Sequence, residues 1–243
     1  EEINMEEQIG SHPRIGATDV CPLIPLKGLT FEEANSYALR LAERVGKELS
    51  IPTYLYEFSS KYKHRRKLAD IRRGGYENFS EKMKLSEWKP DYGPYTFNPK
   101  TGATVVGVRK ILVAFNINLN TDDPKIASKI ASQIREGGNN GLFGVRAIGW
   151  FIPEFKFAQV SLNITDYKAT PIYQVFERCK EVALNYGVLV TGSELIVMIP
   201  KDALIESGRY YAIPHILDDE YALNLGIEKL GLNINKQERI LIF

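Results

Sequence analysis

The stretch TVVGVRKILVAFNINL, residues 104–119, is rich in β-branched residues and predicts strand along most of its length. From residue 111 onward its side chains alternate between two faces. One face carries Ile111, Val113, Phe115, Ile117 and Leu119. The other carries Leu112, Ala114, Asn116 and Asn118. We expect this segment to lead from one sheet into another, with the boundary between two lobes near residues 104–110.

The chain after residue 108 predicts the order strand, helix, strand, strand, helix, strand. Helical patterns with Pro at the start and Gly at the end cover residues 122–138 and 170–187. Further strands are VRAIGWFI (145–152), AQVSLNIT (158–165) and ELIVMI (194–199), and shorter helices follow at 200–211 and 218–231. This order is the split βαβ pattern of a ferredoxin-like unit.

The chain before residue 108 predicts strand, helix, strand and then a polar, irregular stretch. Thr30 and Glu33 form a capping box at the start of an amphipathic helix over residues 29–49, and IPTYLYEF (51–58) follows as a strand. We therefore predict an α/β protein of the α+β type with subdomains 1–107 and 108–243. Each is expected to hold a mixed β-sheet with helices on one face, the second being ferredoxin-like.

Composition argues against several classes of function. The formal net charge of +1 gives no general attraction to nucleic acid or to an anionic membrane. No apolar run approaches the roughly 20 residues that span a bilayer. The two cysteines, Cys21 and Cys179, are too few for a disulfide scaffold and are expected as buried free thiols. With an acidic N-terminus that has no apolar signal region, these features predict a cytoplasmic protein.

Polar side chains line one face of the strand over residues 158–165. Gln159, Ser161, Asn163 and Thr165 alternate with apolar residues, as Asn116 and Asn118 do in the earlier strand. Helices would cover the apolar faces. The polar faces are then either solvated or the floor of a polar ligand cleft.

Two irregular stretches are candidates for chemistry. GSHPRIGATDVCPLIPLKG (10–28) holds His12 beside Pro13 and Gly16, so His12 is either an acid–base group or a surface histidine without a role. PDYGPYTFNPKTGATVVG (90–107) is either a functional loop or a linker between subdomains. Seven Lys or Arg lie within residues 61–76, as a solvated helix face or an anion clamp. Metal, P-loop and dinucleotide motifs are absent from the sequence.

Several of these stretches resemble the glutamate formiminotransferase family. The resemblance lies in HPRIGATDVCPLIPL (12–26), IPTYLYE (51–57), RRKLADIRRGGYE (65–77) and WKPDYGP (88–94), and continues in GATVVGVRKILVAFNINL (102–119), AIGWFI (147–152), AQVSLNITD (158–166) and TGSELIVMIP (191–200). It covers nearly the whole chain in the family's order. Family members carry a further segment before the histidine loop, so the chain is expected to lack that N-terminal segment.

The resemblance implies a folate-dependent enzyme. Such enzymes move a formimino group from N-formiminoglutamate to N5 of tetrahydrofolate, which acts as co-substrate, in histidine degradation and one-carbon metabolism. The resemblance also implies two α/β subdomains with a folate-binding tunnel between them. The family's catalytic histidine aligns with His12. Its folate loop aligns with Gly93, Pro94, Tyr95, Thr96, Phe97, Asn98, Pro99, Lys100, Thr101 and Gly102.

Other residues are assigned from the chemistry that this reaction needs. Arg14 is a supporting residue, and Arg14, Lys100 and Arg109 are candidates for the glutamate carboxylates. Asp19 either orients His12 or holds the loop shut. Asn116, Asn118 and Asn163 are expected as amide partners of the pterin. No metal, nucleic acid or membrane is expected, and a homodimer is left open. The alternative is a folate-binding homologue with impaired catalysis.

Overall fold

The structure, a computed structural model, describes residues 3–9, 13–196, 198–212, 218–232 and 240–241. The chain divides into two compact units, Glu1–Lys110 (unit 1) and Ile111–Phe243 (unit 2). The stretch 104–119 supplies one strand to each unit, as β3 (Thr104–Val108) and β4 (Val113–Leu119). Among the described residues, no helix combines the length and apolarity that crossing a bilayer requires.

Unit 1 contains a parallel sheet in the order β1–β3–β2. Besides β3, its elements are β1 (Val20–Leu23), α1 (Phe31–Glu48), β2 (Thr53–Leu55), α2 (Leu68–Arg72) and α3 (Phe79–Met83). Short 3-10 turns lie at Glu57–Ser59, Lys63–Arg65, Tyr76–Asn78 and Ser86–Trp88. The predicted capping box at Thr30 and Glu33 is confirmed at the start of α1.

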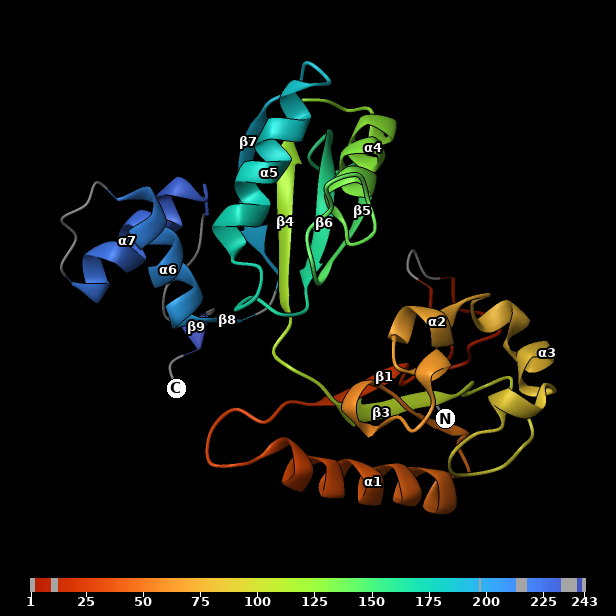
Figure 1. Ribbon diagram of the computed structural model, residues 1–243. Coiled ribbons are helices and arrows are strands. Elements are labelled where there is room, and N and C mark those ends of the chain that lie inside the picture. The colour runs from red at the N-terminus through yellow and green to blue at the C-terminus, as the bar shows by residue number, and fades with distance from the viewer. Residues whose placement is uncertain (1–2, 10–12, 197, 213–217, 233–239, 242–243) are drawn as a thin grey trace. The chain divides into compact units, whose positions relative to one another are not determined.

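Helices cover both faces of the unit 1 sheet (Figure 1). Small residues of α1 pack on the face that carries Leu55, Val106 and Val108. Ile71 of α2 and Phe79 of α3 pack on the opposite face with Tyr54, Tyr56 and Val105. The α+β class is confirmed. For this unit, the prediction that helices cover one face of the sheet only was wrong, and the sheet is parallel rather than mixed. The helices α2 and α3 are too short for their sequences to show a readable helical period.

Unit 2 contains an antiparallel sheet in the order β5–β6–β4–β7. Besides β4, its elements are α4 (Pro124–Ile134), β5 (Val145–Ile152), β6 (Phe157–Ile164), α5 (Ile172–Leu184), β7 (Val190–Leu195), β8 (Ile199–Pro200), α6 (Lys201–Tyr211), α7 (Asp219–Lys229) and β9 (Ile240–Leu241). The predicted ferredoxin-like arrangement is confirmed. The sheet is antiparallel throughout rather than mixed, because an antiparallel strand separates the two parallel strands of each split βαβ unit: β6 lies between β4 and β5, and β4 lies between β6 and β7.

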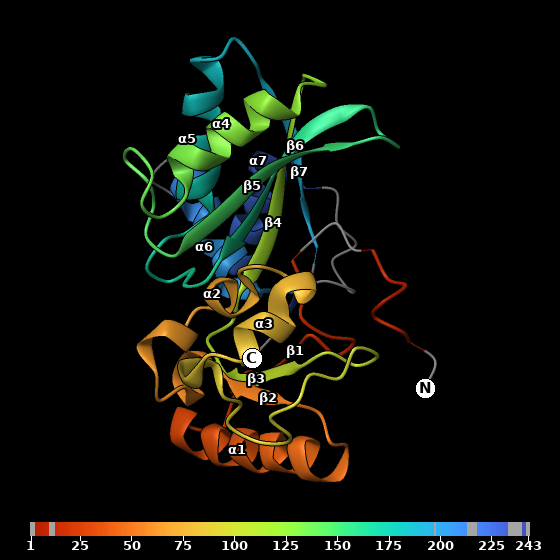
Figure 2. The same ribbon diagram turned by 90° about the vertical axis from the view of Figure 1, so that its right-hand side faces the viewer.

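The helices α4 and α5 cover one face of this sheet (Figure 2). Phe115, Ile117 and Leu162 point into the core beneath them, and Cys179 of α5 is fully buried there as expected. The strand alternation read from residues 111–119 is therefore confirmed on its apolar side. The face with Asn116 and Asn118 lies opposite α4 and α5.

Candidate functional site

His12 lies outside the described residues, but the loop that follows it is fixed within unit 1. Ile15 is completely buried, and Gly16 forms an antiparallel bridge with Gly102. The amide of Ala17 donates to the Thr101 carbonyl at 2.9 Å, and the amide of Ala103 donates to the Ile15 carbonyl at 2.9 Å. The two stretches that sequence reasoning selected, 13–19 and the end of 93–102, therefore lie side by side.

Two glycines allow this close approach. Gly102 has φ +63°, in the left-handed region, and a β-carbon on it would lie 2.1 Å from the Ile15 carbonyl oxygen. A β-carbon on Gly16 would lie 2.1 Å from the Ala103 carbonyl oxygen. Any side chain at either position would force the two loops apart.

Asp19 holds the turn of the loop together. Its Oδ1 accepts from the Ile15 amide at 2.7 Å, and its Oδ2 accepts from Arg72 Nε at 2.8 Å and from the Arg72 Nη2. Both side chains are mostly shielded, with 17% of Asp19 and 27% of Arg72 exposed. Both oxygens of Asp19 thus serve loop structure, which favours the loop-holding alternative for this residue.

Arg14 is already engaged by protein groups. Its guanidinium donates to Glu77 Oε1 at 2.8 Å and to the Gln8 carbonyl, and it lies 5.6 Å from the centre of the Tyr76 ring. The Tyr76 hydroxyl in turn donates to the Pro99 carbonyl at 2.5 Å. Arg14 therefore anchors the chain just after residue 12 to Glu77 and Tyr76. Through the hydroxyl of Tyr76, this anchor also reaches Pro99 of the 93–102 loop.

The 93–102 loop is ordered by its own residues and largely exposed. Asn98 Oδ1 accepts from the Lys100 amide at 3.0 Å, and the Asn98 carbonyl accepts from the Gly102 amide at 2.7 Å. The Phe97 ring packs 5.4 Å from the Tyr76 ring, while Tyr95 is 44% exposed. Pro94 and Thr101 are half-buried, and Thr96, Pro99 and Lys100 are exposed. At the other end Gly93 has φ +85°, and a β-carbon there would lie 2.5 Å from the Ile51 carbonyl oxygen.

The basic stretch 61–76 has a structural use that its composition did not indicate. Arg65 is only 2% exposed and donates to the carbonyls of Glu87 and Lys89 and to Asp91 Oδ2. Asp91 Oδ2 also accepts from the Leu55 amide at 2.8 Å. This pair fixes the start of the loop at residues 90–102 against β2, so a solvated face or an anion clamp does not describe Arg65.

Unit 2 presents a hydrogen-bonded polar cluster on the face opposite α4 and α5. Gln159 Nε2 donates to Asn118 Oδ1 at 2.7 Å and to Glu194 Oε1 at 2.8 Å. Asn116 Nδ2 donates to the same Glu194 oxygen at 3.3 Å. The Trp150 indole donates to Gln159 Oε1 at 2.8 Å. Asn116 and Asn118 are thus brought together by Gln159 and Glu194.

The three asparagines predicted as pterin partners differ in their exposure to solvent. Asn116 is 3% exposed, Asn118 is half-buried, and Asn163 is exposed on the neighbouring strand, paired in register with Ala114 and Arg146. Only part of this face is therefore open.

Sequence reasoning missed Arg72, Glu194 and Trp150. Glu194 was detectable, because an acidic residue inside the predicted strand 194–199 demands polar partners. Arg72 was hidden within a basic run, and its partner Asp19 lies 53 residues away. No group of His, Cys, Asp and Glu side chains suited to a metal ion occurs in the described part of the chain.

Comparison with known proteins relates this geometry to one family. Residues 1–109 match the family described as the formiminotransferase domain, N-terminal subdomain, and residues 114–241 match the formiminotransferase domain. The glutamate formimidoyltransferase of Streptococcus pyogenes serotype M1 is 44% identical over 211 residues, which cover 87% of this chain and 70% of that protein. That of Thermoplasma acidophilum is 40% identical over 229 residues, which cover 93% and 75%.

A longer class of relatives matches as well. The formimidoyltransferase-cyclodeaminase of Mus musculus is 39% identical over 251 residues, which cover 98% of this chain and 46% of that protein. The chain thus spans about half the length of these cyclodeaminase relatives.

Proposed function

Because the chain belongs to the formiminotransferase family, we propose that it transfers the formimino group of N-formiminoglutamate to N5 of tetrahydrofolate. The observation that carries this proposal is the family match over both units, joined by relatives named glutamate formimidoyltransferase at 40% and 44% identity. Tetrahydrofolate is a co-substrate in this scheme.

His12 is the proposed general acid–base group. The N5 amine attacks the amidine carbon of the formimino group, and a tetrahedral species forms as that amine loses its proton. The departing glutamate nitrogen then gains a proton as its bond to the carbon breaks. One imidazole that titrates near neutral pH serves both steps without a covalent enzyme intermediate. The fixed loop at residues 13–19, held by Asp19 and Arg72, supports this assignment.

The proposed folate contacts are the loop Gly93–Gly102 and the amides Asn116, Asn118 and Asn163. Exposed Tyr95, Thr96, Pro99 and Lys100 support a ligand role for the loop. Arg14 is the weakest candidate for a substrate carboxylate, because Glu77 already pairs with it. We assign the glutamate carboxylates to Lys100 and Arg109, and keep Arg14 as a support of the histidine loop.

A cytoplasmic location is part of the same proposal. Its support is the pair of free thiols, Cys21 and Cys179, which persist in a reducing compartment.

The test is turnover by the purified chain. N-formiminoglutamate and tetrahydrofolate are supplied together, and both released glutamate and the folate product are measured. We expect equal amounts of the two, with no glutamate released when tetrahydrofolate is omitted. Tight folate binding without turnover would replace the proposal by its alternative, a folate-binding homologue with impaired catalysis.

A further inference from the structure

Glu194 is a carboxylate on the polar face of the unit 2 sheet, where its nearest partners are neutral amides. It lies in β7, an edge strand of the unit 2 sheet, and pairs in register with Asn116 of β4. Its neighbour Leu195 is fully buried on the other side of the sheet, whereas Glu194 is half-buried on the polar face. The fold therefore holds a negative charge at the β7 edge of that face at the cost of partial desolvation.

Among the described residues, the hydrogen bonds of Glu194 use only one of its oxygens. Within the part of the chain that the structure describes, Gln159 Nε2 and Asn116 Nδ2 both donate to Oε1. Both donors are neutral amides, and no cation pairs with Glu194 among these residues. Two N–H bonds satisfy the acceptor sites of Oε1, so Oε2 retains the capacity to accept.

The surrounding cluster fixes this arrangement. Gln159 is completely buried, and its amide oxygen accepts from the Trp150 indole while its nitrogen donates to Asn118 and Glu194. Because the amide oxygen and the amide nitrogen of Gln159 are both engaged, the amide group cannot rotate by half a turn without losing hydrogen bonds. The carboxylate is therefore held in one orientation before any ligand arrives.

We propose that Glu194 binds, through Oε2, a planar N–C–N donor group of the ligand. A charge-assisted N–H bond to a partly desolvated carboxylate is stronger than a neutral one, and a cationic donor also neutralises the charge. The inference rests on the proposed function, in which both substrates carry such a group. In N-formiminoglutamate it is the formimino amidine, and in tetrahydrofolate it is the 2-amino-pyrimidinone edge of the pterin.

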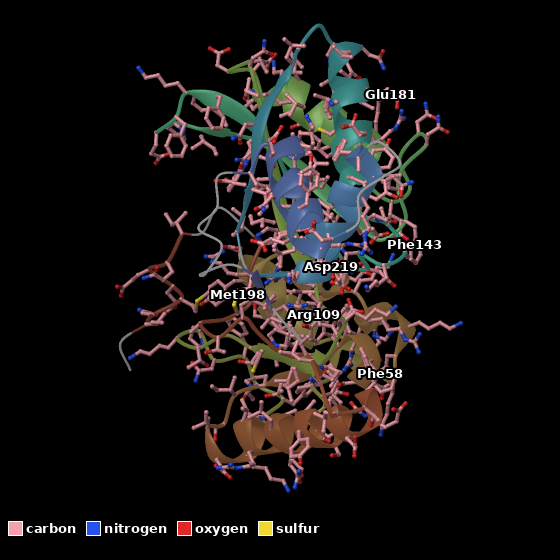
Figure 3. All side chains as sticks on the ribbon, turned by 90° about the vertical axis from the view of Figure 1, so that its left-hand side faces the viewer. Phe58, Arg109, Phe143, Glu181, Met198 and Asp219 are labelled. Atoms are coloured by element: carbon pink, nitrogen blue, oxygen red, sulfur yellow. The ribbon has the colours of Figure 1, made fainter. Side chains whose placement is uncertain are left out.

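The first experiment uses formamidinium chloride as the probe and needs no catalytic activity. Glu194→Gln keeps an acceptor oxygen for the two amides and removes the charge. Glu181→Gln on α5 is the matched control, because Glu181 is 67% exposed and lies on a helix that covers the other face (Figure 3). By NMR titration we expect saturable binding to the parent and to Glu181→Gln, with affinity about tenfold or more weaker in Glu194→Gln.

The second experiment identifies which substrate supplies the donor group. Dissociation constants of N-formiminoglutamate and of tetrahydrofolate are measured separately for the parent, Glu194→Gln and Glu194→Asp. A tenfold loss confined to the first ligand in Glu194→Gln assigns the formimino group, and one confined to the second assigns the pterin. Glu194→Asp, which keeps the charge, is expected to recover part of the loss and remains informative if Glu194→Gln fails to fold.

Failures of the two proposals are distinguishable. Unchanged affinity of folded Glu194→Gln for formamidinium and for both substrates overturns this inference, whatever the transferase activity. A loss in Glu194→Gln that comes with altered Trp150 fluorescence in the ligand-free Trp88→Phe background also overturns it, because Glu194 then only supports the cluster. If the parent is inactive but still binds formamidinium through Glu194, the proposed transferase function is refuted while the proposed binding site at Glu194 stands.

Discussion

Arg72 supports the histidine loop through its ion pair with Asp19. Its guanidinium satisfies one oxygen of Asp19, whose other oxygen fixes the Ile15 amide. We expect Arg72→Met to lower the free energy of unfolding by about 1–2 kcal/mol, because a mostly shielded carboxylate loses its charged partner. In a double-mutant cycle with Asp19→Asn, the coupling energy should be about 1 kcal/mol.

The control for this cycle is the exposed pair Arg44–Glu48 on α1, where both side chains are more than half exposed. The coupling energy of this pair should be about 0.3–0.5 kcal/mol, the usual range for solvated helix pairs. Equal coupling in the two cycles would show that the Asp19–Arg72 pair adds nothing to the loop.

The proposed role of His12 leads to a prediction about rate rather than stability. His12→Ala should reduce turnover by about 10²–10⁴-fold, the usual contribution of a positioned acid–base group. Folate affinity and the thermal midpoint should stay close to those of the parent. A variant that retains the parental rate would contradict the acid–base assignment.

The two cysteines should differ sharply in reactivity. Cys179 is fully buried, and this burial raises its thiol pKa to about 12, whereas Cys21 is half-buried in β1. At pH 8 only about one Cys179 in ten thousand would be thiolate. Ellman's reagent should therefore modify a single thiol in the native protein and both in denaturant.

Cys21→Ser is the control for this labelling. It should leave no rapidly reacting thiol in the native state. Rapid native labelling of Cys21→Ser would show that α5 is packed less tightly than its place in the core indicates.

At the scale of elements, the pairing of residues 15–17 with 101–103 depends on the absence of a side chain at residue 102. Gly102→Ala adds a β-carbon 2.1 Å from a backbone oxygen and strains a positive φ. Gly28→Ala is the matched control, since Gly28 has φ +70° but its added β-carbon meets no atom of the described residues within 4 Å. We expect the control to cost about 1–2 kcal/mol and Gly102→Ala to cost clearly more, by urea unfolding. Equal costs would show that the loops part without penalty.

Elements with strong local signals were predictable from the sequence. The capping box of α1, the Pro at the start of α4 and the alternation in β4 and β6 all rest on residues within one turn or one strand. The loop pairing was not predictable, because Gly16 and Gly102 meet across 86 positions with no local pattern. The amphipathic pattern of residues 29–49 is carried by small residues, because Ala34, Ala38, Ala42 and Gly46 are buried in α1 while the larger Tyr37 and Leu49 are exposed.

At the scale of the whole molecule, the segment 104–119 was expected to lead from one sheet into another, and β3 and β4 do lie in different sheets. The layers of unit 1 were harder to foresee. Its second helical layer comes from five-residue helices in a polar stretch, where long-range contacts of Arg65 and Ile71 replace periodicity. The candidate site depends both on local sequence patterns and on long-range contacts. Its loops were visible as Gly- and Pro-rich stretches, whereas the ion pairs that fix them join distant positions.

Unit 2 has a core of its own, so residues 111–243 should fold without unit 1. Phe115, Ile117 and Leu162 pack beneath α4 and α5 within this unit, and the sheet is complete in the order β5–β6–β4–β7. We expect the fragment to show helix and strand signals by circular dichroism and a cooperative thermal transition. The control fragment 120–243 lacks β4, which lies inside the sheet between β6 and β7, and should not melt cooperatively. Neither fragment should catalyse formimino transfer, because His12 and the 93–102 loop are absent. A non-cooperative melt of fragment 111–243 would mean that its core depends on unit 1 for stability.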